Sequence, residues 1–109
     1  MKNVKNGNEL LLVLEALSNP YRLKIIETLS GERQYVSQLA RALGISRPLL
    51  YLHLKKLEEA ALIKGEEERG EDGKVMKYFE VLPFGIELND RMIADAAGTV
   101  TLKNKDKGD

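Results

Sequence analysis

The chain of 109 residues contains no cysteine and a single histidine, His53. Without thiols it can form neither disulfides nor thiolate metal sites, and it has no cysteine nucleophile. One imidazole leaves little scope for acid–base or metal chemistry. The sequence also shows no Ser/His/Asp set, no phosphate-cradling glycine loop and no metal-ligand spacing. We therefore expect a protein that is not an enzyme and that uses no metal or cofactor.

Long apolar runs are missing as well. No stretch approaches the ~20 apolar residues that span a bilayer, and the N-terminal MKNVKNGNE lacks the hydrophobic region of a signal peptide. We expect a cytoplasmic protein with no membrane partner. A chain of this length forms one small domain, which is poorly suited to enclosing a large active-site cavity.

Neither sign of charge is in excess, because 17 lysines and arginines balance 17 aspartates and glutamates. This balance argues against a uniformly basic coat for nucleic acid. The charges are unevenly distributed, however. Residues 20–57 hold seven basic and two acidic side chains, whereas residues 58–72 hold two basic and seven acidic ones. The middle of the chain could therefore meet a polyanion that the following segment would repel.

Residues 36–62 have the pattern of two helices joined by a tight turn. Gly44 can supply the left-handed residue that ends the first helix, and Ser46 can cap the second, which carries Pro48 in its first turn. The apolar face of the first helix consists of Val36, Leu39, Ala40 and Leu43. We predict a helix-turn-helix whose second helix runs from residue 47 to about residue 61.

The second helix is expected to be packed on one face and open on the other. At ~100° per residue one apolar stripe forms, and it consists of Leu50, Leu54, Leu57 and Ala61. His53 lies beside this stripe, so we expect a packed or interface residue rather than a ligand or a base reader. The outer face and its margins hold Arg47, Pro48, Leu49, Tyr51, Leu52, Lys55, Lys56 and Glu59. DNA would lie on this outer face.

Two helices are predicted before this motif. Asn8 can cap a helix from Glu9 to about Leu17 that is apolar around most of its circumference, which fits a subunit interface and an ordinary core helix equally well. Asn19 and Pro20 can open a second helix that closes at Gly31. Its packed face is predicted to consist of Leu23, Ile26 and Leu29.

After residue 62 the period becomes strand-like. The segments IKGEEER and KVMKYFEV flank a glycine-rich turn at residues 70–73, which predicts a β-hairpin at about residues 63–81. The alternation extends weakly through Phe84, Ile86 and Leu88, although Pro83 would confine that part to a sheet edge or a bend. A hairpin directly after a helix-turn-helix indicates a winged helix.

Asn89 can cap a last helix at residues 90–97, which could join the first helix in a dimer seam. The residues expected in that interface are Leu10, Leu11, Leu14, Met92 and Ile93. Residues 99–109 are polar and of mixed charge, and we expect them to be disordered. The predicted DNA-binding domain thus spans residues 1–98, with a core at residues 19–82.

The segments LSNPYRLKIIETLSG and VSQLARALGISRPLLYLHLKKLEEAALI resemble the ArsR-type winged-helix regulators of prokaryotes, from Leu17 to about Val81. The resemblance implies a mainly α fold with a small β-hairpin: a three-helix core, a wing, and terminal dimerisation elements. It also implies a homodimeric transcription regulator, often a repressor, that places the second helix of the motif in the major groove of double-stranded DNA and releases DNA on binding a ligand. Tyr35-Val36-Ser37 stands where the metal-sensing branch carries two cysteines, so any effector is left open.

The residues expected to contact DNA are Arg47, Pro48, Leu49, Tyr51, Leu52, Lys55, Lys56, Arg69 and Lys74. Lys55 and Lys56 could neutralise phosphates or simply be solvated. Arg47 could reach a guanine edge or a phosphate, or pair with a carboxylate such as Glu32. Tyr51 could touch the DNA backbone or close the edge of the core.

Two features support a different function. Pro48, Leu49, Tyr51 and Leu52 form an apolar strip of the kind that often binds another protein. The carboxylates of the hairpin would repel phosphates unless they face away, and they could pair with Arg69, Lys74 and Lys77 instead. A winged-helix module for protein interaction is therefore the alternative to a DNA-binding regulator.

Overall fold

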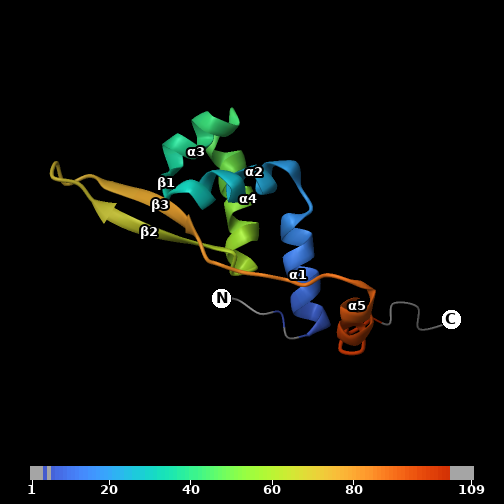
Figure 1. Ribbon diagram of the computed structural model, residues 1–109. Helices are drawn as coiled ribbons and strands as arrows, with labels where there is room; N and C mark the ends of the chain where they lie inside the picture. The colour runs from blue at the N-terminus through green and yellow to red at the C-terminus, as the bar shows by residue number, and fades with distance from the viewer. Residues whose placement is uncertain (1–3, 5, 104–109) are drawn as a thin grey trace.

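The computed structural model describes residue 4 and residues 6–103 (Figure 1). The helices in this part of the chain are α1 (Gly7–Leu17), α2 (Pro20–Gly31), α3 (Val36–Leu43), α4 (Arg47–Glu59) and α5 (Asp90–Ala97). The strands are β1 (Gln34–Tyr35), β2 (Ile63–Arg69) and β3 (Val75–Val81). The predicted fold class, mainly helical with a small hairpin, is confirmed.

The helix-turn-helix consists of α3 and α4. Gly44 ends α3 with a φ of 67°, in the left-handed region that glycine enters without steric cost. The Ser46 side chain then caps α4 by accepting a hydrogen bond from the N–H of Leu49 at 3.3 Å. Both predictions of turn chemistry are confirmed.

The end of α4 differs from the prediction. The helix stops at Glu59, and Ala61 is exposed with a φ of 59°, so it is wrong to place Ala61 in the packed stripe. Ala60 is the buried residue instead, at 1% exposure. The N–H of Leu62 bonds the carbonyl of Leu57 at 3.0 Å, a helix-ending bond that turns the chain into β2.

The core lies between the first four helices and the base of the hairpin. Its buried residues are Val13, Ala16, Ile25, Leu29, Val36, Leu39, Leu50, Leu54, Leu57, Ala60, Leu62, Ile63 and Phe79. The predicted face of α2 is wrong at Leu23, which is 55% exposed, while Ile25 is fully buried. Two residues along a helix correspond to a rotation of about 200°, so Leu23 points away once Ile25 packs inward.

The sheet has the antiparallel order β1-β3-β2. Strand β1, which the sequence analysis did not predict, pairs Gln34 with Phe79 and Tyr35 with Tyr78. The hairpin spans the predicted residues. Its second strand ends at Val81, so the predicted extension through residue 88 does not form as a continuous strand; Phe84 and Ile86 pack against the core from an irregular segment.

Helix α1 begins two residues earlier than predicted. Asn6, not Asn8, is the cap, and its side chain accepts a hydrogen bond from the N–H of Glu9 at 2.8 Å. Asn8 instead bonds the side chain and the N–H of Thr101, both at 3.3 Å. The contacts of the domain therefore reach residue 101, within the predicted tail, while residues 104–109 lie outside the described residues.

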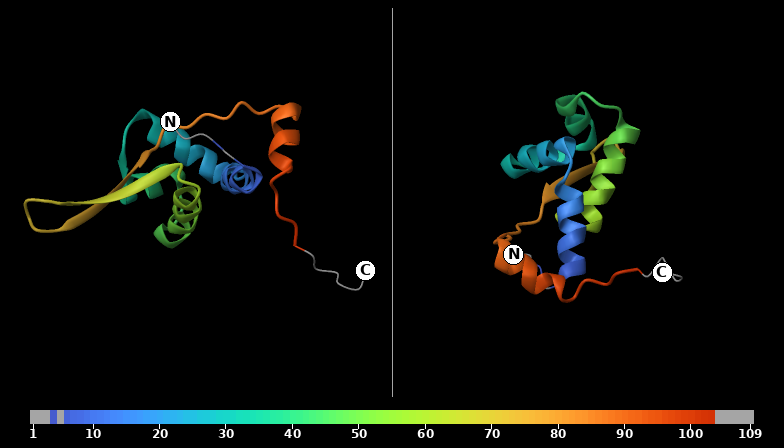
Figure 2. Two further views of the ribbon diagram at one scale, coloured as in Figure 1. Left: turned by 90° about the horizontal axis from the view of Figure 1, so that it is seen from below. Right: turned by 90° about the vertical axis from the view of Figure 1, so that its right-hand side faces the viewer.

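Helix α5 has the predicted bounds and the predicted Asn89 cap. It lies beside the N-terminal end of α1, away from the helix-turn-helix (Figures 1 and 2). Gly7 permits this close approach, because a Cβ there would stand 2.3 Å from the carbonyl oxygen of Ala96. The two terminal helices thus form one unit at the end of the molecule.

Candidate nucleic-acid interface

Helix α4 is held on one face and open on the other, as predicted. Leu50, Leu54 and Leu57 are fully buried. On the outer face Leu52 is 63% exposed, Tyr51 42% and Leu49 40%. The polar residues Arg47, Lys55 and Lys56 are exposed too, as is Pro48. Every residue of α4 that we predicted as a DNA contact therefore lies at the surface.

The outer face of α4 continues into the hairpin. Arg47 and Tyr51 line a concavity of about 370 Å³ together with Glu67, Val75 and Lys77 of the two wing strands. Figure 1 shows the hairpin extending from the helices beside this end of the motif. The helix and the wing therefore offer one composite surface. The lining of the concavity within it holds two basic groups, Arg47 and Lys77, and one carboxylate, Glu67.

The hairpin divides its charges between two faces. Cross-strand partners share a face, and the face alternates along a strand. Glu67 opposite Lys77 and Arg69 opposite Val75 therefore lie on one face, whereas Glu66 and Glu68 lie on the other. Arg69 donates a hydrogen bond to the carbonyl of Gly73 at 3.1 Å, which ties it to the turn, and Lys74 is exposed beside that turn. Two of the wing glutamates thus face away from the concavity.

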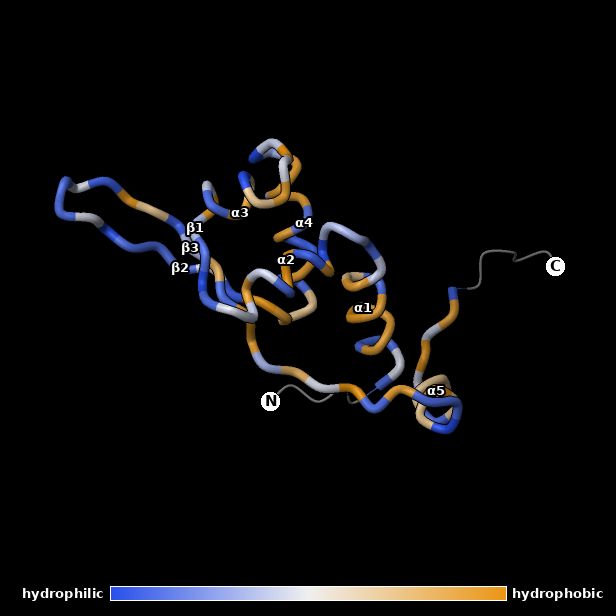
Figure 3. Tube along the Cα trace, turned by 45° about the horizontal axis from the view of Figure 1, so that its top comes forward, coloured by the Kyte–Doolittle hydropathy of each residue, from blue (hydrophilic) through white to orange (hydrophobic). Residues whose placement is uncertain are grey.

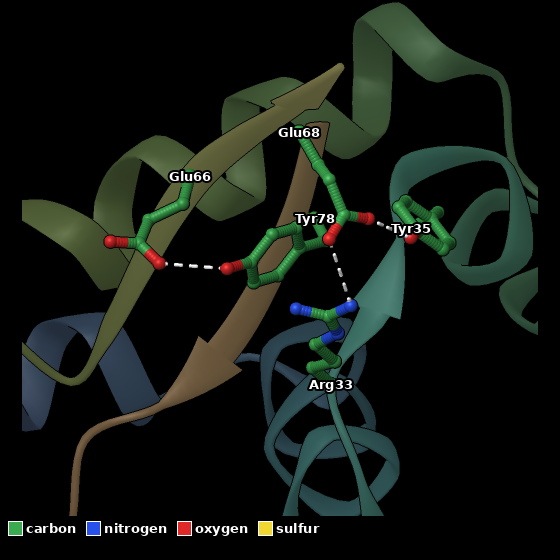
Figure 4. Close-up of polar contacts among 5 residues, drawn as sticks. All are labelled: Arg33, Tyr35, Glu66, Glu68 and Tyr78. Atoms are coloured by element: carbon green, nitrogen blue, oxygen red, sulfur yellow. Dashed lines mark hydrogen bonds and ion pairs between the residues drawn. The ribbon is translucent and has the colours of Figure 1, made fainter. Parts of the chain in front are cut away.

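The hairpin face that holds Glu66 and Glu68 carries a cluster of side chains (Figure 4), of which Tyr35 also lines the concavity. The hydroxyl of Tyr35 donates to Oε1 of Glu68 at 2.5 Å, and Nη2 of Arg33 lies 3.3 Å from Oε2 of the same carboxylate. The hydroxyl of Tyr78 donates to Glu66 at 2.8 Å, and the Arg33 guanidinium stands 4.0 Å from the centre of the Tyr78 ring. The Tyr35 hydrogen bond and the Arg33 charge lower the pKa of Glu68.

Sequence reasoning missed this cluster. It depends on β1, a strand of two residues that no periodic pattern could reveal. The signal that could have been used is the alternation of side chains along a strand, because it places Glu67 on one face of the hairpin and Glu66 and Glu68 on the other.

A second contact connects α4 to the helices beneath it. His53 is 9% exposed and stacks on Tyr21, with ring centroids 5.4 Å apart. Its Nδ1 lies 3.0 Å from Nη1 of Arg22. Because a guanidinium can only donate, Nδ1 must accept, and the neutral ring carries its proton on Nε2. Burial and the charge of Arg22 both lower the pKa of His53. The prediction that His53 is packed is confirmed.

Arg22 links three helices through this contact. It belongs to α2, bonds His53 of α4, and donates from Nε to the carbonyl of Ala16 at 2.6 Å. That carbonyl is in the last turn of α1, where helix carbonyls lack partners within the helix. The position of α4 is thus coupled to the helix expected at the dimer seam.

Comparison with known proteins agrees with this geometry. A family described as a helix-turn-helix domain matches residues 17–66. The matched segment includes the helix-turn-helix formed by α3 and α4. An uncharacterized HTH-type transcriptional regulator of Methanocaldococcus jannaschii is 46% identical over 52 residues, which cover 48% of this chain and 55% of that protein. The match thus spans little more than half of that relative's length.

Solved structures of similar fold include winged helix-turn-helix proteins. A homodimeric winged helix-turn-helix DNA-binding domain from Mycobacterium bovis, from a possible ArsR-family transcriptional regulator, has a TM-score of 0.60 at 24% identity and covers 68% of this chain and 64% of its own. The transcriptional repressor BigR from Xylella fastidiosa has a TM-score of 0.55 at 28% identity, covering 70% and 72%. The winged helix-turn-helix fold is confirmed, and the resemblance to ArsR-type regulators holds at the level of the fold.

The candidate dimer surface of this winged helix-turn-helix chain differs in detail from the predicted one. Leu10 is 5% exposed and is therefore packed within its own chain. Leu14 and Met92 are half-buried. Leu11 is 53% exposed, Ile93 46%, and Leu12, which we did not predict, 43%. Figure 3 shows that α1 is hydrophobic along most of its length, whereas the wing is largely hydrophilic.

Among the described residues, no three histidine, cysteine, aspartate or glutamate side chains come together in a way that could hold a metal ion. No helix in the described part of the chain is long and apolar enough to span a membrane.

Proposed function

We propose that the chain is a homodimeric DNA-binding transcription regulator that acts as a repressor. Helix α4 would enter the major groove, and the wing would follow the adjacent backbone. The observation that carries this proposal is the composite surface of α4 and the wing, which is exposed along α4 and carries Arg47, Lys55 and Lys56. The two wing carboxylates on the opposite face weaken the electrostatic objection to DNA binding.

Each predicted contact has a role in this arrangement. Lys55 and Lys56 neutralise phosphates, as do Arg69 and Lys74 from the wing. Arg47, at the start of α4, reaches a base edge or a phosphate. The remaining contacts are apolar or aromatic, and they read thymine methyl groups and the shape of the groove; they are Pro48, Leu49, Tyr51 and Leu52.

The dimer and the direction of control are supported by similarity. The Mycobacterium bovis domain with this fold is a homodimer, and BigR is a repressor. Helix α1 leaves Leu11 and Leu12 exposed side by side, which a second copy of the chain would cover. Core residues 19–82 would then bind DNA while α1 and α5 pair the subunits, giving half-sites about one helical turn apart.

The test is a fluorescence-anisotropy titration with a duplex from the region upstream of the coding sequence and with a random duplex, at low and at physiological salt. We expect Lys55→Ala to weaken binding to both duplexes and to lower the salt slope by ~1. Arg47→Ala should in addition reduce the preference between them. Lys24→Ala is the matched control, because Lys24 is exposed on α2 and paired with Glu27 at 3.2 Å.

Two results would contradict the proposal. If the protein fails to bind either duplex at low salt, α4 is not a DNA-reading helix. The apolar residues of α4 would then indicate a protein-interaction module instead, because Leu52 is 63% exposed. In that case Leu52→Glu should abolish capture of the partner and leave the fold intact.

A further inference from the structure

The wing has little backbone connection to the rest of the molecule. β1 and β3 pair at Gln34–Phe79 and Tyr35–Tyr78. Outward from Tyr78, the ladder of the described sheet joins β2 to β3 alone, as far as Arg69 and Val75. Figure 2 shows this outer part of the hairpin projecting clear of the helices. The helices and β1 are called the body below. Backbone hydrogen bonds to the body therefore do not fix the angle at which the wing projects.

Glu68 connects the outer part of the wing to the body through its side chain. It pairs in register with Met76, two residues beyond the Tyr78 level where β1 stops. Its side chain reaches back over β3, which lies between β2 and β1 in the sheet. Both carboxylate oxygens bind groups of the body, since Oε1 accepts from Tyr35 at 2.5 Å and Oε2 lies 3.3 Å from Arg33.

A neighbouring hydrogen bond offers an internal comparison. Tyr78 donates to Glu66 at 2.8 Å, and these two residues are register partners within the hairpin. This bond resembles the Tyr35–Glu68 bond in chemistry and lies on the same face of the sheet (Figure 4). It joins the wing only to itself, however, and so cannot restrain the wing relative to the body.

We propose that Tyr35 and Glu68 form a latch that holds the wing at the angle DNA binding requires. Both are positioning residues, because their side chains bond each other and act on DNA through the angle of the wing. Glu68 lies outside the lining of the concavity, and Tyr35, which does line it, donates its hydroxyl to Glu68. The inference rests on the proposed function. It makes a prediction opposite in sign to that of simple electrostatics, in which any carboxylate near DNA only repels phosphates.

The first test compares two variants that each lose one hydroxyl and no charge, Tyr35→Phe and Tyr78→Phe. Anisotropy titrations use a fluorescein-labelled random duplex of about 30 base pairs, and Tyr35→Phe should bind about 3- to 10-fold more weakly with a smaller salt slope. Tyr78→Phe should bind like the wild type. Glu68→Ala should bind more weakly although it removes a negative charge. Wild-type binding by Tyr35→Phe, or tighter binding by Glu68→Ala, would overturn the proposal.

The second test observes the wing without DNA. Because the chain has no cysteine, spin labels attach only at Asp72→Cys in the hairpin turn and Ala42→Cys in α3. Pulsed electron paramagnetic resonance measures the distribution of distances between the two labels. An excess of unlabelled chain ensures that each measured pair lies within one subunit. Tyr35→Phe should broaden it and Tyr78→Phe should not, while thermal unfolding shows that each variant folds.

The outcomes separate the two proposals. An unchanged distribution in Tyr35→Phe overturns the latch even if DNA binding falls. A broadened distribution with unchanged DNA affinity overturns the latch's role in binding. Failure of the wild type to bind DNA overturns the proposed function and the latch's role in it, and the distances then decide only whether Tyr35 restrains the wing.

Discussion

Arg22 and His53 show how two side chains can fix the relation of three helices. Arg22 satisfies a carbonyl at the end of α1 and the Nδ1 of a buried imidazole on α4. A guanidinium suits this position because its several N–H groups point in fixed directions and never lose their charge. The cost is that the imidazole must stay neutral, since a protonated Nδ1 would place a donor against a donor.

This arrangement predicts a loss of stability in mild acid. Because burial and then Arg22 lower the pKa of His53, the folded state takes up its proton less readily than the unfolded chain. The free energy of unfolding should thus have its maximum value at pH values above the ordinary pKa of about 6.5. It should decrease as the pH is lowered further, by at most about 1.4 kcal/mol per pH unit. Urea unfolding at fixed protein concentration, at pH values from about 7.5 to about 5.5, measures the slope.

His53→Gln is the matched variant, because an amide oxygen can still accept from Arg22 and does not titrate. His53 is the single histidine of the chain, so the variant should lose the pH dependence in this window. If the free energy of unfolding depended on pH with the same slope in both proteins, His53 would not be the group responsible.

At the scale of the element, α4 is a helix with two separate tasks on its two faces. Leu54 is fully buried and Leu52 is 63% exposed, although the residues are only two apart. Truncating Leu54 to alanine leaves a cavity and should cost about 2–5 kcal/mol of unfolding free energy. Leu52→Ala should change stability by less than about 1 kcal/mol.

Chemical denaturation followed by circular dichroism measures both variants. If Leu52→Ala were as destabilising as Leu54→Ala, the outer face of α4 would be packed in solution and unable to read DNA.

Elements with a local signal could be predicted from the sequence, and elements without one could not. Gly44, Ser46 and Asn89 act within a few residues of themselves, so the turn and the caps of α4 and α5 were predicted correctly. The prediction was wrong at Leu23 because the four aliphatic residues of α2 allow two different packed faces, and tertiary packing selected the face with Ile25. Partners across the sheet, such as Tyr35 for Glu68, depend on tertiary pairing, so the exposure of the predicted DNA contacts was foreseen but the latch was not.

The whole molecule is extended, with the wing projecting at one end and α1 with α5 at the other (Figure 2). If α1 pairs the subunits, Leu11→Glu together with Leu12→Glu should convert the dimer to a monomer and weaken operator binding, because each half-site then binds independently. Sedimentation velocity measures the oligomeric state. Leu23→Glu is the control, since Leu23 is equally exposed at 55% but lies on α2. Dissociation by the control variant, or a dimer in the double variant, would contradict this interface.

The sheet order has a further consequence for the wing. β2 is an edge strand, because in the described sheet it pairs with β3 alone. The unpaired N–H and C=O groups of such an edge can template a strand from another chain, which is a common start of aggregation. Two wings laid edge to edge would bring the consecutive carboxylates of Glu66, Glu67 and Glu68 against their copies. The same acidic run that repels phosphates should therefore also oppose edge-to-edge pairing of projecting hairpins.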